Sequence, residues 1–256
     1  MIEQIAVVGA RGAMGGLLSR SFSRAGCQVV ALDKPLPVED IPGMLQDIQL
    51  VLVSVPISVF SDVVETVAPA MPSEAILADV CSVKVLPMKS MEKFFPGPVL
   101  GTHPLFGPEP GADQELKTVM CPGRNISEKE VAMVENLFLR AGMKTFRASA
   151  DEHDKAMACI QSLNYVTTVS YFASLPDDLD LGRFATPSFM RRITSARKMI
   201  NQDSSLFSAL AEDNPYTGQM IRRFKSFLNL SAAGELELLQ DKALWWWRND
   251  NSKTGG

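Results

Sequence analysis

The amino-terminal segment constrains the fold more than any other part of this chain. An apolar run, Ile5–Val8, leads into a turn with glycine at positions 9, 12 and 15, and a helical pattern begins at Ala13. A strand, a glycine turn and a helix in this order form the usual cradle for a dinucleotide pyrophosphate, because backbone N–H groups at the positive helix end are accessible to phosphate oxygens. Ala10 replaces a glycine of the common Gly-x-Gly-x-x-Gly pattern, so a turn used only for packing is the alternative. The expected cradle residues are Gly9, Ala10, Arg11, Gly12, Ala13 and Met14.

Apolar runs and helical patterns alternate through the first part of the chain. The expected strands are Ile5–Gly9, Gln28–Asp33, Leu50–Val55, Ala75–Asp79, Pro98–His103, Thr118–Cys121 and Lys144–Ala148. Helical periodicity lies between them, at Ala13–Ala25, Val59–Ala70 and Glu128–Ala141. This alternation predicts an α/β domain over residues 1–150, with a Rossmann-type, mostly parallel sheet covered on both faces.

The character of the sequence changes at about Asp151. The remainder lacks β-branched runs and is divided by prolines at positions 176, 187 and 215. The expected helices are Asp151–Leu175, Pro187–Asn201, Ser204–Glu212, Thr217–Asn229 and Ala232–Trp247. These patterns predict a second, all-α domain over residues 151–256.

Composition excludes several classes of function. A net charge of −4 and a pI near 5.3 give no basic stripe for a nucleic-acid backbone, and no apolar stretch is long enough to span a bilayer. The amino terminus lacks the basic and apolar regions of a secretion signal, so we expect a cytoplasmic protein with no nucleic-acid or membrane partner. The four cysteines form no Cys-x-x-Cys pair and the two histidines are far apart, so we expect reduced thiols and no metal.

Asp33, at the end of the second expected strand, predicts the cofactor. A carboxylate there accepts hydrogen bonds from both adenosine ribose hydroxyls and repels a 2′-phosphate, which favours NAD over NADP. Lys34 beside it is suited to pair with a 2′-phosphate, so use of NADP remains the alternative. A simple turn aspartate is the other interpretation.

One of the two histidines, His103, ends the fifth expected strand. Ligands of open α/β sheets bind at the carboxyl ends of strands, and a neutral imidazole, with an ordinary pKa of about 6.5, is suited to accept a proton near neutral pH. Ser82 follows the preceding strand, so we expect it at the same edge, where it orients the imidazole or shares a substrate hydroxyl. A hydrogen-bonded core histidine is the alternative.

Four segments together resemble one enzyme family. They are Leu100–Glu109 (Leu-Gly-Thr-His-Pro-Leu-Phe-Gly-Pro-Glu), Asp79–Lys84 (Asp-Val-Cys-Ser-Val-Lys), Ser54–Ile57 and Glu152–Asp154. On these motifs the chain resembles the prephenate/arogenate dehydrogenase family over nearly its whole length, and most of all the dehydrogenase half of its bifunctional bacterial members. The resemblance implies NAD-dependent oxidative decarboxylation of prephenate to 4-hydroxyphenylpyruvate, or of arogenate to tyrosine, in tyrosine synthesis. Because a strand begins at once, we expect a stand-alone dehydrogenase without a chorismate mutase half.

The resemblance also implies roles for individual residues. Ser82 and His103 match the catalytic serine and histidine of the family. A strand end at Ser54, Val55 and Pro56 is implied to line the cofactor beside the nicotinamide ribose, and a strand simply ended by a proline is the alternative. Glu109 is implied to lie near the substrate mouth, where a solvated turn is the alternative. Lys84 is interpreted as a surface lysine, with a charge near the site as the alternative. His153, at a polar helix start, is interpreted as a structural residue that caps the helix or lies at the domain junction.

The substrate-binding residues are expected in the helical part. Gln161 and Asn164 are three residues apart, on one face of a helix, and an amide stands at position 164 where several relatives have a histidine. The arginine that relatives use against the substrate carboxylate falls in residues 189–197. A shift of one residue from Met190 favours Arg191 over Arg192 for this bidentate contact.

Three adjacent tryptophans, at positions 245–247, end the last expected helix. They cannot all share one helical face, and exposed aromatic clusters mark interfaces, so we expect a homodimer formed through the helical domains. Two other functions remain open: a β-hydroxyacid-type reductase, in which Lys155 on the first long helix would be the catalytic lysine, and a catalytically silent dimer that senses NAD. The three hypotheses differ in the small-molecule substrate that is turned over: a cyclohexadienyl acid for the dehydrogenase, a 3-hydroxy acid for the reductase, and none for the sensor.

Overall fold

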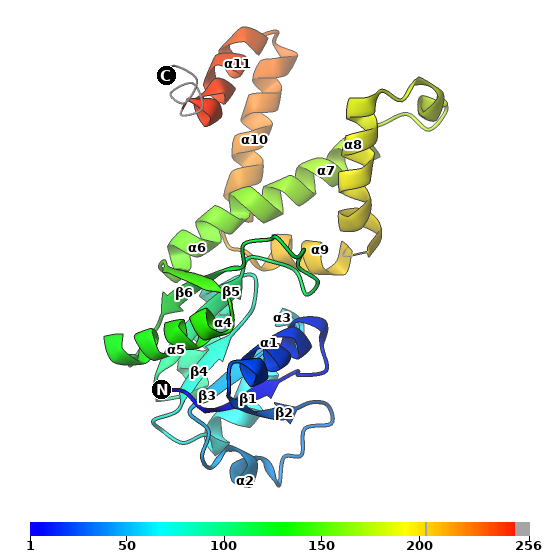
Figure 1. Cartoon of the computed structure of the whole chain (residues 1–256). Coiled ribbons are helices and arrows are strands. Elements are labelled where there is room, and N and C mark those ends of the chain that lie inside the picture. The colour runs from blue at the N-terminus through cyan, green and yellow to red at the C-terminus, as the bar shows by residue number, and fades with distance from the viewer. Residues whose placement is uncertain (203, 249–256) are drawn as a thin grey trace, which may run out of the picture.

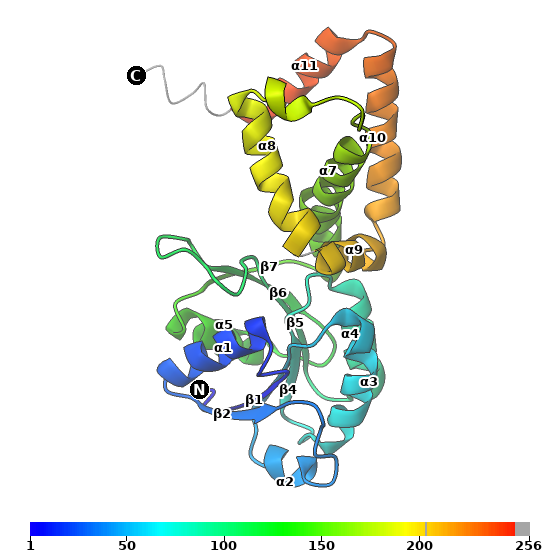
Figure 2. The same ribbon diagram turned by 90° about the vertical axis from the view of Figure 1, so that its right-hand side faces the viewer.

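The computed structural model describes residues 1–202 and 204–248 and has two parts, a sheet covered by helices and a group of helices that extends from it (Figures 1 and 2). The strands are β1 (Gln4–Val8), β2 (Gln28–Leu32), β3 (Leu50–Val53), β4 (Ile76–Asp79), β5 (Val99–Pro104), β6 (Lys117–Pro122) and β7 (Lys144–Arg147). They form one sheet in the order β2-β1-β3-β4-β5-β6-β7, in which only the β5–β6 pair is antiparallel. The predicted α/β class and mostly parallel sheet are confirmed.

Helices cover both faces of this sheet. They are α1 (Ala13–Arg24), α2 (Ile41–Leu45), α3 (Ile57–Val67) with the 3₁₀ turn η1 (Ala68–Ala70), α4 (Val85–Phe94) and α5 (Glu128–Arg140). Helices α1 and α5 bury one apolar stripe each against one face, where Phe22 meets Phe138 edge-on at 5.3 Å between ring centroids. Helices α2, α3 and α4 cover the other face with side chains such as Phe60 and Met91. Each helix is thus held by its amphipathic face rather than by its own propensity.

Two of these helices are absent from the sequence-based prediction. Helix α2 is only five residues long, too short for a periodic pattern. In α4, Pro87 reads as a helix breaker, but it stands in the first turn, where its missing N–H group has no partner to lose.

The helical part begins directly after the sheet. It contains α6 (Ala150–Met157), η2 (Ala158–Ser162), α7 (Leu163–Ala173), η3 (Leu181–Phe184), α8 (Pro187–Arg197), η4 (Lys198–Gln202), α9 (Ser204–Asp213), α10 (Thr217–Ala232), α11 (Leu236–Leu244) and η5 (Trp245–Trp247). The segment from α6 to α7 extends away from the sheet, α9 lies near the sheet, and α8 and α10 rise beside α7 (Figure 2). Within the described residues, no helix has the length and hydropathy needed to cross a membrane.

Three sequence-based helix assignments in this part are wrong in detail. The expected helix Pro187–Asn201 ends in a π-helical turn, η4. The expected single helix Asp151–Leu175 contains a π-helical turn, η2, and such turns are frequent at functional sites. The expected last helix does not start at Ala232. Helix α10 continues to that residue because alanine favours helix, and Gly234, with φ of +89°, ends it before α11 begins at Leu236.

Candidate active site at the carboxyl edge of the sheet

The strand order places the predicted site residues along one edge of the sheet. The parallel strands β2, β1, β3, β4 and β5 end there in that sequence, followed respectively by Asp33, the Gly9 turn, Ser54 and Ser82, with His103 inside the end of β5. Neighbouring strands are about 4.8 Å apart, so Asp33 and His103 are separated by four strand steps, roughly 19 Å. A ligand long enough to span this edge would therefore reach from the glycine turn to His103.

The glycine turn is built for close approach. Gly9 has φ of +87°, and a Cβ atom there would lie 2.3 Å from the carbonyl oxygen of Ser54. A Cβ at Gly15 would lie 2.2 Å from the carbonyl oxygen of Gly9. Helix α1 then starts at Ala13 with neither a side-chain cap nor an acidic residue in its first turn. Its amino-terminal N–H groups and positive dipole end therefore suit a phosphate ligand.

Asp33 lies beside this turn. Its Oδ2 accepts a hydrogen bond of 3.0 Å from the backbone N–H of Arg11, which fixes the carboxylate next to the cradle. Both residues line a groove of about 770 Å³ that runs between α1 and the β2 edge. Lys34, Arg20 and Arg24 line the same groove, so cationic side chains accompany the carboxylate.

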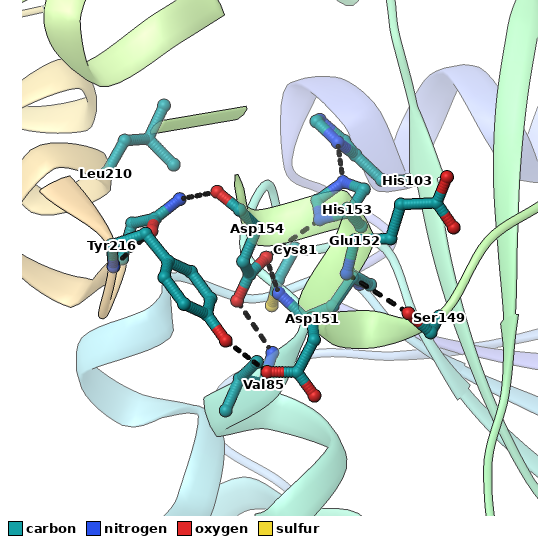
Figure 3. Close-up of polar contacts among 12 residues, drawn as sticks. Cys81, Val85, His103, Ser149, Asp151, Glu152, His153, Asp154, Leu210 and Tyr216 are labelled. Carbon is teal, nitrogen blue, oxygen red and sulfur yellow. Dashed lines mark hydrogen bonds and ion pairs between the residues drawn. The ribbon is translucent and has the colours of Figure 1, made fainter. Parts of the chain in front are cut away.

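His103 is part of a buried chain of three polar residues (Figure 3). Its Nδ1 is 2.8 Å from Nε2 of His153, and Nδ1 of His153 is 2.8 Å from Oδ1 of Asp154. The two rings meet edge-on with centroids 5.1 Å apart. Burial holds the pKa of His103 well below its ordinary value, and the neighbouring His153 and Lys84 lower it further. His103 is therefore a neutral imidazole near pH 7.

A buried ion pair lies next to the hydrogen-bonded residues His103, His153 and Asp154. Nζ of Lys84 contacts the Asp79 carboxylate and donates to the carbonyl oxygen of Thr102 at 2.6 Å. Lys84 is fully buried, so its interpretation as a surface lysine is wrong. The sequence does not reveal the pairing, because the two residues are separated by the turn from β4 to α4 and meet only in the fold. Burial and the Asp79 charge raise the pKa of the neighbouring Cys81 thiol well above its ordinary value.

Comparison with known proteins shows similarity to one enzyme family. Residues 35–146 match the model of the prephenate dehydrogenase nucleotide-binding domain. The T-protein of Enterobacter agglomerans is 32% identical over 230 residues, which are 87% of this chain and 60% of the relative. The T-protein of Haemophilus influenzae is 28% identical over 98% of this chain and 63% of its own length. The matched domain and these relatives support assignment of the chain to the prephenate/arogenate dehydrogenase family. It spans less than two thirds of the length of these two relatives.

Solved structures of the prephenate/arogenate dehydrogenase family share the fold of this chain. The Synechocystis arogenate dehydrogenase matches with a TM-score of 0.76, at 19% identity over 98% of this chain and 99% of that one. The Aquifex aeolicus prephenate dehydrogenase, in complex with hydroxyphenyl propionate and NAD+, matches with a TM-score of 0.78, at 16% identity over 99% and 97%. The similarity in fold therefore extends over both the sheet and the helical part.

The remaining candidate residues lie around the edge of the sheet without joining the buried chain of His103, His153 and Asp154. Ser82 is half-buried in the turn from β4 to α4, and the hydrogen-bond partner of the His103 Nδ1 is His153 instead. Glu109 is exposed in the β5–β6 loop, and Val55 and Pro56 follow β3 beside the Gly9 turn.

In the helical part, the π-helical turn separates Gln161, half-buried in η2, from Asn164, exposed on α7, so the expected common face is not regular helix. Arg191 and Arg192 are both exposed on α8, and the Arg192 guanidinium stacks 3.5 Å from the centroid of the Tyr171 ring. Lys155 is exposed on α6, 5.2 Å from the Tyr216 ring centroid, which disfavours the β-hydroxyacid-type assignment.

Two members of the buried chain were not expected as site residues. His153, interpreted from the sequence as a structural residue, contacts the ring of His103 and is held in turn by Asp154. The available signal was the pair of histidines itself, one at a strand end and one in Glu-His-Asp. Their separation of 50 residues in the chain hid the contact. No group of three His, Cys, Asp or Glu side chains within residues 1–202 and 204–248 is arranged to hold a metal ion.

Proposed function

We propose that the protein catalyses the NAD-dependent oxidative decarboxylation of prephenate to 4-hydroxyphenylpyruvate, in the cytoplasm, with arogenate to tyrosine as the close variant. The observation that carries this proposal is the neutral, buried His103 at the carboxyl edge of the sheet that also holds the glycine cradle. The match of residues 35–146 to the prephenate dehydrogenase nucleotide-binding domain supports the choice of reaction, and the NAD+ complex of the Aquifex enzyme supports the cofactor.

The tight glycine turn and the uncapped start of α1 fit the pyrophosphate of NAD. The cradle at Gly9–Met14 would hold that group, Asp33 would accept from the adenosine ribose, and Ser54–Pro56 would line the nicotinamide ribose. When bound, the nicotinamide supplies the hydride acceptor. The carboxylate of Asp33, already oriented by Arg11, disfavours a 2′-phosphate.

His103 serves as the general base for the substrate hydroxyl. The O–H proton passes to Nε2 of His103 while the carbinol carbon is oxidised to a ketone. This ketone is conjugated with the ring double bonds, which adjoin the carbon that carries the ring carboxylate, so the bond from that carbon to the carboxylate breaks, CO2 departs and the ring becomes aromatic. The bonding pair ends on the former carbinol oxygen, and the His103 imidazolium returns its proton there. No metal is needed for this sequence.

The helical part supplies the substrate contacts in this proposal, with residues 1–150 as the cofactor domain and 151–256 as the substrate and dimerisation domain. Arg191 pairs with the ring carboxylate, and Gln161 and Asn164 contact the polar ends of the substrate. Glu109, in the β5–β6 loop of the cofactor domain, adds a contact at the substrate mouth.

A second copy of the chain completes the assembly. Helices α7 and α11 bury no residue within the chain, and Trp246 is 76% exposed. The chain exposes 15030 Å², whereas a compact monomer of 28.0 kDa exposes roughly 11,000 Å². Light scattering should therefore give a dimer mass near 56 kDa, about twice 28.0 kDa. A mass of one chain at micromolar concentration would contradict the dimer.

The reaction is tested by following NADH formation through the absorbance of the reduced nicotinamide. Purified protein is given NAD with prephenate, arogenate or a 3-hydroxy acid in parallel. We expect turnover with a cyclohexadienyl acid and none with the 3-hydroxy acid. Turnover with the 3-hydroxy acid alone would assign a β-hydroxyacid reductase, and NADH binding without any turnover would assign a sensor.

A further inference from the structure

The buried chain from His103 to Asp154 decides which nitrogen of each histidine carries the proton. An ionised carboxylate only accepts hydrogen bonds, so Nδ1 of His153 donates to Asp154 Oδ1 at 2.8 Å. A neutral His153 then has its lone pair on Nε2. The 2.8 Å contact between the rings therefore requires His103 to donate from Nδ1, which leaves the lone pair of His103 on Nε2.

The ionised state of Asp154 has its own support in the fold. Its Oδ1 accepts from the backbone N–H of Lys84 at 2.7 Å, and its Oδ2 accepts from the N–H of Val85 at 2.9 Å. These groups belong to the start of α4, so the carboxylate lies at the positive end of a ten-residue helix. The carboxylate therefore has charge-stabilising partners besides His153, and a cationic His153 is not required to neutralise it.

We propose that His153 is a positioning residue, which fixes His103 as the Nδ1–H tautomer with Nε2 free to accept a proton, and that Asp154 anchors it. This inference rests on the proposed function for its catalytic consequence, although the tautomer follows from the contacts alone. When His103 takes the substrate proton at Nε2, its Nδ1–H bond to His153 strengthens, and the developing charge is stabilised through the second imidazole towards the Asp154 carboxylate. His153 and Asp154 together orient His103, as the aspartate alone orients the histidine in a serine-protease triad. Here one additional imidazole lies between the base and the carboxylate.

The contacts that link His103, His153 and Asp154 join the two parts of the protein. His103 lies on β5, His153 and Asp154 lie on α6, and Asp154 caps α4 beside the turn that holds Ser82. Asn214 donates to the carbonyl oxygen of Asp154 at 2.8 Å and ties this junction to the segment between α9 and α10. The base is thus oriented from the helical part, not from its own strand.

Nuclear magnetic resonance tests the tautomers without substrate. The chain contains only two histidines, so protein labelled with ¹⁵N-histidine has two imidazoles to observe. At pH 8 we expect both to be neutral, with the proton on Nδ1, and the spectrum of the His153→Gln variant assigns the pair. A proton on Nε2 of His103, or a cationic His153 at this pH, would overturn the proposal even if the enzyme turns over prephenate.

Steady-state kinetics test whether the positioning of His103 by His153 increases kcat. His153→Phe keeps an aromatic ring against His103 and removes both hydrogen bonds, and it should lower kcat about 10- to 100-fold with the KM for prephenate within about twofold. His153→Gln keeps a carbonyl acceptor for the Nδ1–H and should recover part of kcat. Equal kcat values for the two variants and the native protein would overturn the proposal.

A matched control removes a neighbouring contact of α6. Tyr216→Phe breaks the hydrogen bond from the tyrosine hydroxyl to Asp151 and leaves the imidazole chain intact. Its kcat should stay within about twofold of the native value, and an equal loss in Tyr216→Phe and His153→Phe would assign the effect to junction stability. If His153→Phe does not fold, the His153→Gln kinetics and the native spectrum decide. Absence of turnover in the native protein would refute the proposed function and leave the tautomer result standing.

Discussion

Asp154 accepts a hydrogen bond of 2.7 Å from the backbone N–H of Lys84, a residue 70 positions earlier in the chain. The contact joins the first helix of the helical part to the start of α4, next to the turn that carries Ser82. Both partners are fully buried. The relative position of the two parts at the proposed catalytic centre is therefore fixed by a charge-assisted hydrogen bond and not by apolar packing alone.

Replacement of the proposed base tests the reaction centre. His103→Asn should lower turnover by about two to four orders of magnitude, because the general base is lost, while the Kd for NAD stays nearly unchanged. Steady-state kinetics and a calorimetric titration with NAD measure the two effects. Turnover near the native value would refute the role of His103.

Asp33 is the test of cofactor choice. Asp33→Ala should weaken NAD binding about 10- to 100-fold and narrow the preference over NADP, because the ribose acceptor and the repulsion of a 2′-phosphate disappear together. Glu39→Ala removes an exposed carboxylate outside the groove and serves as the control. If the native protein already binds NADP as tightly as NAD, then the cations of the groove dominate and the assignment fails.

The substrate anchor is tested on α8. Arg191→Ala should raise the KM for prephenate about 10- to 100-fold and leave that for NAD unchanged, as expected for a lost bond to a carboxylate. Arg192→Ala should change KM little, because that guanidinium already stacks on Tyr171. An effect of Arg192 alone would place the anchor one residue later. No effect of either would direct attention to Arg197, at the end of α8.

The buried ion pair predicts a large effect on stability. Lys84→Met leaves the Asp79 carboxylate buried without its cation, which should lower the free energy of unfolding by about 3–5 kcal/mol. Lys89→Met, at an exposed position of the same helix, should change it by less than about 0.5 kcal/mol. Urea unfolding of both variants gives the comparison, and equal midpoints would show that the pair contributes nothing.

Stability should also depend on pH through His103. Its pKa in the folded protein lies well below the ordinary value of about 6.5, so the unfolded chain binds a proton first as the pH falls. The free energy of unfolding should therefore decrease below pH 6.5, by at most about 1.4 kcal/mol per pH unit from this group. The charged and titratable neighbours are His153 on α6, anchored by Asp154, and Lys84 at the start of α4. Urea unfolding of His103→Asn at pH 7.5 and 5.5 should give a smaller decrease than the native protein, and an identical decrease would contradict the assignment.

Much of the fold was predictable because its signals are local. Seven apolar runs became seven strands, and the glycine turn became a strand–helix junction in which Gly9 adopts positive φ. The position of Asp33, Ser54 and His103 at one edge also followed from strand alternation, since parallel strands end at the same side. Helix α4 was missed because a proline in a first turn resembles a breaker in the sequence.

The sequence by itself determined the α/β sheet, the helical part and the candidate base, because hydrophobic periodicity and glycine spacing act over a few residues. Only the tertiary structure decided what surrounds that base. The contacts of His103 with His153, of Asp154 with Lys84, and of Lys84 with Asp79 form across a sheet strand, a helix start and a turn. Their strength comes from burial, where an unpaired polar group is costly, and burial is a property of the assembled fold.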